Sequence, residues 1–197
     1  MRFALSAALA ASLLGTLALT GPAYASPAAQ TTTQDGAGTL DPATYEGTME
    51  VATPSGGVVV EVRAGEALEV AKRVREAAAM GEADKYGTLL PAGVSCGDRV
   101  NSVAGPATYW DSIDGCAVFG YPGYQRGYRW FNTSSVTICA SGRGYNSKGA
   151  SGWYSAGCLS GGASTTRMIP WGNVLAYTKM SAISISGATG GAYQWNT

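Results

Sequence analysis

The side chains that most enzymes use for acid–base or nucleophilic chemistry are scarce in this sequence of 197 residues, which contains no histidine. Without an imidazole group, Ser-His-Asp and Cys-His mechanisms and histidine metal ligands are excluded. The segment Gly93–Gly97 matches the G-x-S-x-G pattern around the nucleophilic serine of many hydrolases. That pattern requires a preceding strand and a histidine base, whereas Pro91 precedes it here, so we interpret Ser95 as a loop residue.

Carboxylates and lysines offer other chemistry, since two carboxylates across a sugar cleft can hydrolyse glycosides and a carboxylate cluster can bind calcium. Asp98, Asp111 and Asp114 are the acids available for either role. Asp114 precedes a glycine, which is typical of a hairpin turn, and we favour the turn over a site. No pattern supports a serine–lysine dyad through Lys148 or Lys179. We therefore expect a protein that is not an enzyme and that uses no metal or cofactor.

Aromatic and arginine side chains gather in one segment, residues 121–131, which holds five aromatic residues and two arginines. Tyr, Trp and Arg are enriched at the centres of protein interfaces, and aromatic rings also stack on sugars. Because side chains alternate across a strand, about half of these aromatic residues should face a core. The candidate partner contacts are Tyr121, Tyr124, Arg126, Tyr128 and Arg129 from this segment, with Leu40 and Tyr45 nearer the N-terminus.

The first 25 residues predict a signal peptide. Arg2 gives a positive start, an apolar run extends from Phe3 to Leu19, and Ala23-Tyr24-Ala25 fits the small-x-small cleavage rule. We expect the mature protein to begin at Ser26 and to be secreted to the extracellular space. The alternative is an uncleaved membrane anchor, but the mature chain has no further apolar stretch long enough to span a membrane.

The cysteines are even in number, at positions 96, 116, 139 and 158, and no two are close enough for a typical zinc site. In an oxidising compartment, two disulfides are the expected state. Three pairings are possible, and we favour Cys96–Cys116 with Cys139–Cys158 because each pair fits neighbouring strands of a hairpin. Each loop of about 20 residues would stabilise the fold by roughly 3 kcal/mol.

The net charge of zero conceals two regions of opposite sign. Residues 26–95 hold ten acids and five bases, for a net charge of −5, whereas residues 96–197 hold three acids and seven bases, for +4. All four cysteines and all five tryptophans also follow residue 95. Seven bases in the second region are too sparse for a nucleic-acid surface.

We therefore expect a division near Pro91, with a polar, flexible, extended arm over residues 26–47 and a hairpin-and-helix segment over residues 48–92. The hairpin strands are expected at 48–53 and 58–63 and the helix at 66–80. This helix has alanine where a robust core would use leucine. The segment should therefore need a partner, either the rest of the chain or another protein.

Residues 93–197 predict an all-β, disulfide-containing domain, because short strand patterns alternate with glycine-rich turns. The fold class is mainly β: a compact, disulfide-stapled β-sandwich or barrel that follows the arm and the small hairpin-and-helix segment. The expected strands span 107–110, 116–121, 128–131, 135–141, 152–158, 166–169, 174–179 and 182–186.

Three functions fit these features. The first is a secreted binding protein that acts as an adaptor or assembly subunit, supported by the arm, the underfilled helix and the opposite charges of the two regions. The second is a secreted inhibitor of a protease or another hydrolase. The third is a secreted enzyme whose acidic N-terminal prosegment is later removed.

Three short patterns carry a family resemblance: residues 141–145 (SGRGY), 153–158 (WYSAGC) and 169–174 (IPWGNV). They resemble small secreted proteins of streptomycetes, and the whole plan is similar to the adaptor subunit of umbrella toxin particles. The resemblance implies a secreted antibacterial toxin complex used in bacterial competition, in which the adaptor links a lectin subunit to the toxin-bearing stalk protein. It would place docking to the stalk in the arm, around residues 31–50, and the second contact on the β domain.

Overall fold

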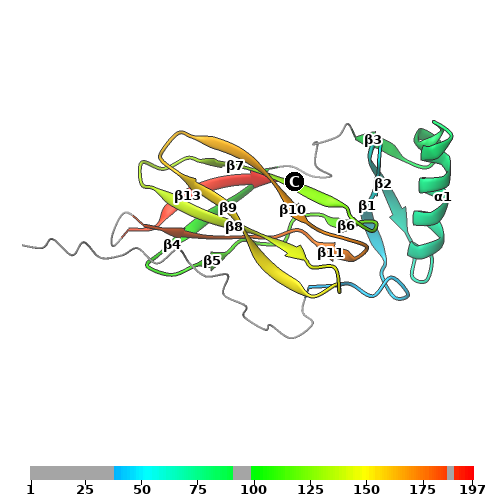
Figure 1. Ribbon diagram of the computed structural model, residues 1–197, viewed down its shortest axis with the longest axis horizontal. Helices are drawn as coiled ribbons and strands as arrows, with labels where there is room; N and C mark the ends of the chain where they lie inside the picture. Colours follow the sequence, from blue (N-terminus) through cyan, green and yellow to red (C-terminus); the bar gives the residue numbers. More distant parts are fainter. Residues whose placement is uncertain (1–37, 91–98, 186–188) are drawn as a thin grey trace, which may run out of the picture.

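The computed structural model describes residues 38–90, 99–185 and 189–197 (Figure 1). Its smaller sheet has five strands in the order β11-β6-β1-β2-β3. These strands are β1 (Gly47–Thr53), β2 (Gly56–Val62), β3 (Thr88–Leu90), β6 (Ala117–Phe119) and β11 (Leu175–Tyr177). β1 pairs antiparallel with β2 and parallel with β6, so the hairpin near the N-terminus extends a sheet whose other half comes from later in the chain.

Helix α1 (Ala67–Ala79) covers one face of this sheet, followed by a 3₁₀ turn, η1 (Ala83–Lys85). Its buried residues are Ala67, Ala71, Val74 and Ala77, which recur at helical spacing and form one face. Ala67, Ala71 and Val74 meet the alternate valines of β2 (Val58, Val60 and Val62) and Met49 and Val51 of β1 in one cluster. The small alanine side chains let the helix lie close to the sheet. No helix in the described part of the chain is long and apolar enough to cross a membrane.

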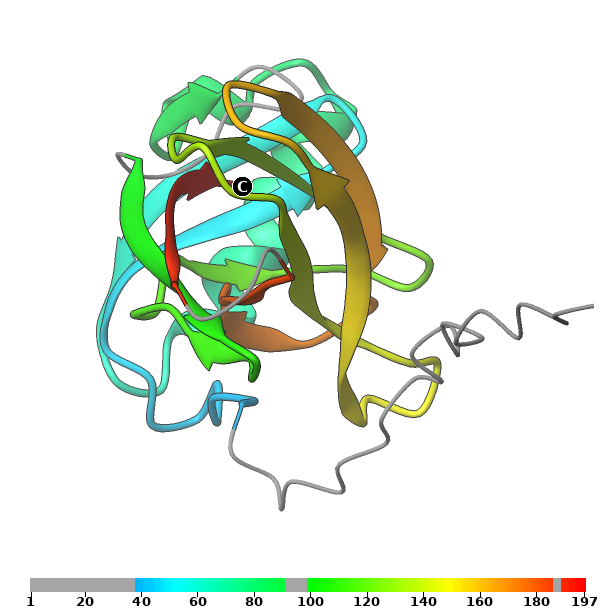
Figure 2. The ribbon, with the colours of Figure 1, turned by 90° about the vertical axis from the view of Figure 1, so that its left-hand side faces the viewer.

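The larger sheet has eight strands in the order β10-β7-β13-β4-β12-β8-β9, with β5 paired to β12. They are β4 (Val100–Pro106), β5 (Trp110–Asp111), β7 (Gln125–Asn132), β8 (Ile138–Tyr145), β9 (Ser151–Leu159), β10 (Ser164–Pro170), β12 (Met180–Ser184) and β13 (Gly191–Asn196). The two edge strands, β9 and β10, follow each other in the chain and are joined by residues 160–163, so the sheet curls into a nearly closed barrel (Figure 2).

Large aromatic side chains fill the barrel, because every second residue of its strands points inward. On β7 the buried residues are Arg126, Tyr128, Trp130 and Asn132. The Tyr128 ring stacks near the Trp195 ring at a centroid distance of 6.0 Å. Trp130 packs edge-on against Tyr193 at 6.3 Å. The fold is thus mainly β, as the sequence predicted, and of the two expected architectures it is the barrel.

Several strand predictions need correction. The chain forms β5 at 110–111 rather than a strand over 107–110, and the strand expected at 182–186 begins at Met180. The strands β3, β4 and β13 were not predicted. β4 and β13 read VNSVAGP and GAYQWN, and their Asn, Ser, Gly and Gln residues hide the alternation of apolar and polar positions. Both strands form because they pair with each other, and a pairing between distant segments leaves no signal in the local sequence.

The expected division near Pro91 does not separate two units, because strands from both sides of it share the smaller sheet. The partner that the hairpin and helix need is therefore the rest of the same chain. The described end of the expected flexible arm is also packed: the Leu40 N–H donates to the Leu175 carbonyl at 2.7 Å, and Tyr45 is only 8% exposed. The predicted signal peptide (1–25) and residues 26–37 lie outside the described residues.

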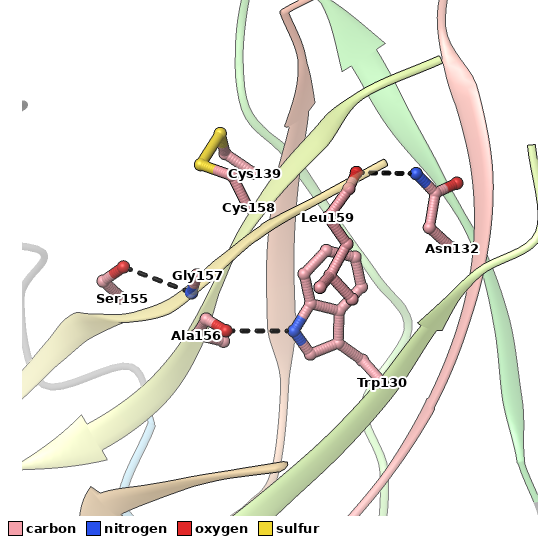
Figure 3. Close-up of a disulfide and its surroundings, with 8 residues drawn as sticks. All are labelled: Trp130, Asn132, Cys139, Ser155, Ala156, Gly157, Cys158 and Leu159. Carbon is pink, nitrogen blue, oxygen red and sulfur yellow. Dashed lines mark hydrogen bonds between the residues drawn. A yellow bond between two sulfur atoms is a disulfide. The ribbon is translucent and has the colours of Figure 1, made fainter. Parts of the chain in front are cut away.

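The expected Cys139–Cys158 disulfide is confirmed. It joins directly opposed residues of β8 and β9, whose Cα atoms are 3.9 Å apart. In Figure 3 the Trp130 indole lies beside the same stretch of β9, where its Nε1–H donates to the Ala156 carbonyl at 3.1 Å. The disulfide therefore ties the edge strand β9 to the barrel. Cys116 is also disulfide-bonded, and the expected pairing with Cys96 falls on a residue outside the described ranges.

Candidate functional site

A buried ion pair forms where the barrel meets the smaller sheet. Arg126 of β7 directs both terminal nitrogens at the Glu50 carboxylate of β1: Nη1 contacts Oε1, and Nη2 donates to Oε2 at 2.9 Å. The side chains of Arg126 and Glu50 are only 5% and 1% exposed. Burial alone would lower the pKa of Arg126, but Glu50 and Tyr124 outweigh that effect and raise the pKa. Arg126 therefore remains charged.

Further hydrogen bonds hold the guanidinium in place. Its Nη2 donates to the main-chain oxygen of Thr197 at 2.6 Å, and its Nη1 donates to the Tyr124 hydroxyl at 3.0 Å. Tyr124 is half-buried, and burial raises the pKa of its hydroxyl although Arg126 opposes this. Arg126 thus joins β1, β7, the loop before β7 and Thr197, the residue after β13, at one point.

Local sequence explains how an acid comes to lie here. β1 is apolar except for Glu50 and its threonines, and its residues from Met49 to Thr53 are all buried because both faces of the strand are covered. Met49 and Val51 face α1, so Glu50 between them points to the barrel side. Gly57 leaves room for the carboxylate, because a Cβ at Gly57 would lie 2.1 Å from the Glu50 Oε1 atom.

A cleft of about 500 Å³ opens above this ion pair, and we refer to it as the Tyr121 cleft. The turn between β1 and β2 forms one wall, with Pro54 and Gly56. The outer surface of β7 and β10 forms the other wall, with Arg129, Thr166 and Met168. The loop residues Tyr121, Gly123 and Tyr124 close one end. The two tyrosine rings contact each other at a centroid distance of 5.2 Å.

A second cavity of about 350 Å³ lies on the other side of Tyr121 and Pro54. Ala78 and Ala79 at the end of α1 give it an apolar lining, and the Arg75 guanidinium borders it. Arg75 is already engaged, since its Nη2 donates to the Gly120 carbonyl at 2.6 Å and its guanidinium lies 5.1 Å from the centre of the Phe119 ring. Burial lowers the pKa of Arg75.

The structure brings together part of the predicted partner-binding set. Tyr121, Tyr124 and Arg129 line the Tyr121 cleft, and Arg126 forms its floor. Tyr128 has no exposed surface, because it points into the barrel and its hydroxyl donates to the Arg143 carbonyl at 2.8 Å.

Leu40 and Tyr45 lie apart from the Tyr121 cleft, packed into the core between α1 and the smaller sheet. Four residues at the cleft were not among the sequence candidates: Glu50, Gly57, Met168 and Thr197. A lone glutamate inside an apolar strand was the one local signal for Glu50. No local pattern could show which arginine it would meet.

None of the sequence candidates for catalysis that the structure describes lines the Tyr121 cleft. Ser95 and Asp98 fall outside the described residues. Asp114 lies near two cations, with its Oδ1 3.5 Å from the Lys179 Nζ and 3.8 Å from the Arg143 Nη1. Lys148 lies in an exposed turn. Among the described residues, no group of three or more His, Cys, Asp or Glu side chains is placed to hold a metal ion.

No family model matches the chain, and no curated protein matches it. A solved structure entitled "Crystal structure of PirA" aligns with 52% of this chain and 95% of its own length, at 15% sequence identity and a TM-score of 0.35. A likeness at this level does not carry a functional argument.

Proposed function

We propose that this protein is a secreted, non-enzymatic binding protein, and that the Tyr121 cleft receives a segment of another exported protein. The observation that carries this proposal is that half-buried tyrosines and an exposed arginine surround a floor whose ion pair is neutralised. Arg126 and Glu50 satisfy each other's charge, so a ligand does not have to compensate a buried ion. Tyr121, Tyr124 and Arg129 belong to the residue types that dominate interface energies.

The adjoining cavity supports a polypeptide ligand. A cleft with mixed polar and aromatic walls can hold a main chain, and the apolar cavity beside it can hold one side chain. Tyr121 and Pro54 line both spaces, so a single bound segment could occupy the two together. Leu40 and Tyr45 pack within this chain, and we therefore base the proposal on the cleft rather than on the arm.

The packing of β1 counts against an enzyme with a removable prosegment. Removal of residues before Pro91 would take Glu50 away and leave Arg126 buried without its counter-charge. Such an unpaired buried charge costs about 3–5 kcal/mol. We instead propose that the N-terminal region is retained in an adaptor. In the umbrella toxin particles that the sequence resembles, the partners would be a lectin subunit and the toxin-bearing stalk protein.

A photo-crosslinking experiment tests this proposal. A benzoylphenylalanine residue is placed at position 121 in the secreting cells, and the matched control places it at Tyr86, an exposed tyrosine far from the cleft in sequence. We expect one defined adduct with another secreted protein from position 121 and none from position 86. A Met168→Glu substitution in the cleft wall should abolish the adduct. An adduct of equal yield at both positions, or none at position 121, would overturn the proposal.

A further inference from the structure

The outer face of the barrel carries an ordered array of polar side chains on β4, β13, β7 and β10. Strand register aligns them in rows, because directly opposed residues of antiparallel strands share a face. One row contains Asn196, Arg129 and Thr166, since Asn196 opposes Arg129 and Arg129 opposes Thr166. Arg99 extends this row, because it precedes Val100, the residue opposite Trp195. The neighbouring row contains Asn101, Gln194, Phe131 and Ser164.

The array forms a groove of about 260 Å³, lined by Arg99, Arg129, Phe131, Ser164, Gln194 and Asn196. We refer to it as the Arg99 groove. Strand β13 lies between β7, which carries Arg129, and β4, which Arg99 immediately precedes. The backbones of the two arginines therefore lie about 10 Å apart. Trp130 and Trp195 also border the groove, while their buried rings pack in the barrel core beneath it.

Among the described residues, no acid compensates the charge of the Arg99 groove. Within these ranges neither Arg99 nor Arg129 takes part in an ion pair, and none of the described residues lining the groove is acidic. The Arg99 Nη1 donates a long hydrogen bond to the Gln194 Oε1 at 3.4 Å. Two exposed guanidinium groups on one concave surface favour a ligand with carboxylates, which arginine binds through two parallel hydrogen bonds.

Apolar side chains flank Arg129 on β7 and on the neighbouring strand β10. Phe131 follows Arg129 by two residues and is 37% exposed, and Met168, opposite Gly127 on the other side, is 59% exposed. Same-face positions along a strand repeat about every 7 Å, and an extended peptide repeats its side chains at the same interval. In an extended segment that reads apolar-x-acidic-x-apolar, the three named side chains would therefore face Met168, Arg129 and Phe131 in turn.

We propose that the Arg99 groove binds an extended acidic segment of a partner protein, in which a carboxylate lies between two apolar side chains. The flanking Phe131 and Met168 favour a polypeptide over an acidic polysaccharide, which has no apolar side chains to bury against them. This site goes beyond the proposed function of the Tyr121 cleft. It adjoins that cleft and shares Arg129 with it, but it adds Arg99 and Phe131 as contacts and favours an acidic ligand.

The test measures binding of a synthetic peptide, Ser-Val-Thr-Glu-Thr-Val-Ser, to the full secreted chain by nuclear magnetic resonance titration. Arg99→Gln and Arg129→Gln should each weaken binding by about tenfold, because each removes a charge-assisted pair of hydrogen bonds. Arg167→Gln is the matched control: it removes an exposed arginine from the adjacent β10 outside the groove, and it should leave the affinity unchanged. The peptide with glutamine in place of glutamate should bind at least tenfold more weakly.

Three results would overturn the proposal. They are equal affinity for the acidic and neutral peptides, equal loss in Arg167→Gln, and binding of oligogalacturonate with no binding of the peptide. The last result would assign the groove to an acidic polysaccharide. The Tyr121→Ala variant separates this site from the cleft, since Tyr121 does not line the groove and its loss should leave peptide binding intact. A missing crosslink at position 121 would therefore count against the cleft proposal, and missing peptide binding would count against the groove proposal.

Discussion

Glu50 and Arg126 form a two-point ion pair across 76 residues of sequence, and this pair joins the N-terminal hairpin to the barrel. Both side chains are buried, and the second Nη of Arg126 also bonds the main chain of Thr197. One guanidinium group thus holds together three parts of the chain that are distant in sequence. The pair also forms the floor of the Tyr121 cleft, so stability and binding depend on the same residues.

Removal of one partner should destabilise the protein strongly. We expect Glu50→Gln to lower the free energy of unfolding by about 3–5 kcal/mol, because Arg126 would remain buried with its charge unpaired. Replacement of both residues by methionine should cost less than either single change. Denaturant unfolding measures these values. Glu76→Gln, which breaks the exposed Lys72–Glu76 pair, is the control and should cost under about 1 kcal/mol.

Gly57 should be intolerant of any side chain. In Gly57→Ala the new Cβ would lie 2.1 Å from the Glu50 Oε1 atom, so the carboxylate would have to shift from its present position against Arg126. We expect a loss of about 1–3 kcal/mol from this overpacking, measured by denaturant unfolding. Gly127→Ala is the control, since its Cβ would meet the Met168 sulfur at an ordinary 3.4 Å. Equal stability of the two variants would contradict this account.

The Cys139–Cys158 disulfide should contribute about 3 kcal/mol, the value expected for a closed loop of about 20 residues. The double variant Cys139→Ser/Cys158→Ser should therefore unfold at lower denaturant concentration. Because β9 lies at the open edge of the barrel, its amide hydrogens should exchange faster in this variant than those of β13. Uniformly faster exchange throughout the barrel would argue against a local role for this bond.

Stability should fall at alkaline pH. Burial raises the pKa of Tyr45, helped by Tyr177, and burial also raises the pKa of Tyr145 and Tyr193, in each case from 10.0 to about 12. Below pH 10 these hydroxyls are neutral in both states, whereas between pH 10 and 12 they ionise only in the unfolded chain. Each should then remove up to about 1.4 kcal/mol per pH unit from the free energy of unfolding.

Denaturant unfolding at about pH 9 and about pH 11 checks this dependence. Tyr45→Phe should show a smaller alkaline loss than the wild type, because phenylalanine has no hydroxyl to ionise. Tyr86→Phe is the control at an exposed tyrosine and should behave like the wild type. A flat profile up to pH 11 would show that the buried tyrosines do not govern alkaline stability.

The predictable parts of the fold are those whose signal lies in adjacent residues. The hairpin of β1 and β2 and the helix α1 follow from alternating valines and from alanines at helical spacing. β7 through β10 also appear near their expected places, since Tyr128 and Trp130 alternate with exposed residues. β4 and β13 could not be predicted, because pairing between residues about 90 positions apart defines them rather than their composition.

The candidate sites divide in the same way. Residue types alone show that tyrosine and arginine concentrate between residues 121 and 129, and they exclude chemistry based on histidine. The pairing of Arg126 with Glu50, the burial of Tyr128 in the core and the shared groove of Arg99 and Arg129 emerge in the folded chain. Residue type fixes what a side chain can do, whereas burial and distant neighbours determine whether it is free to act.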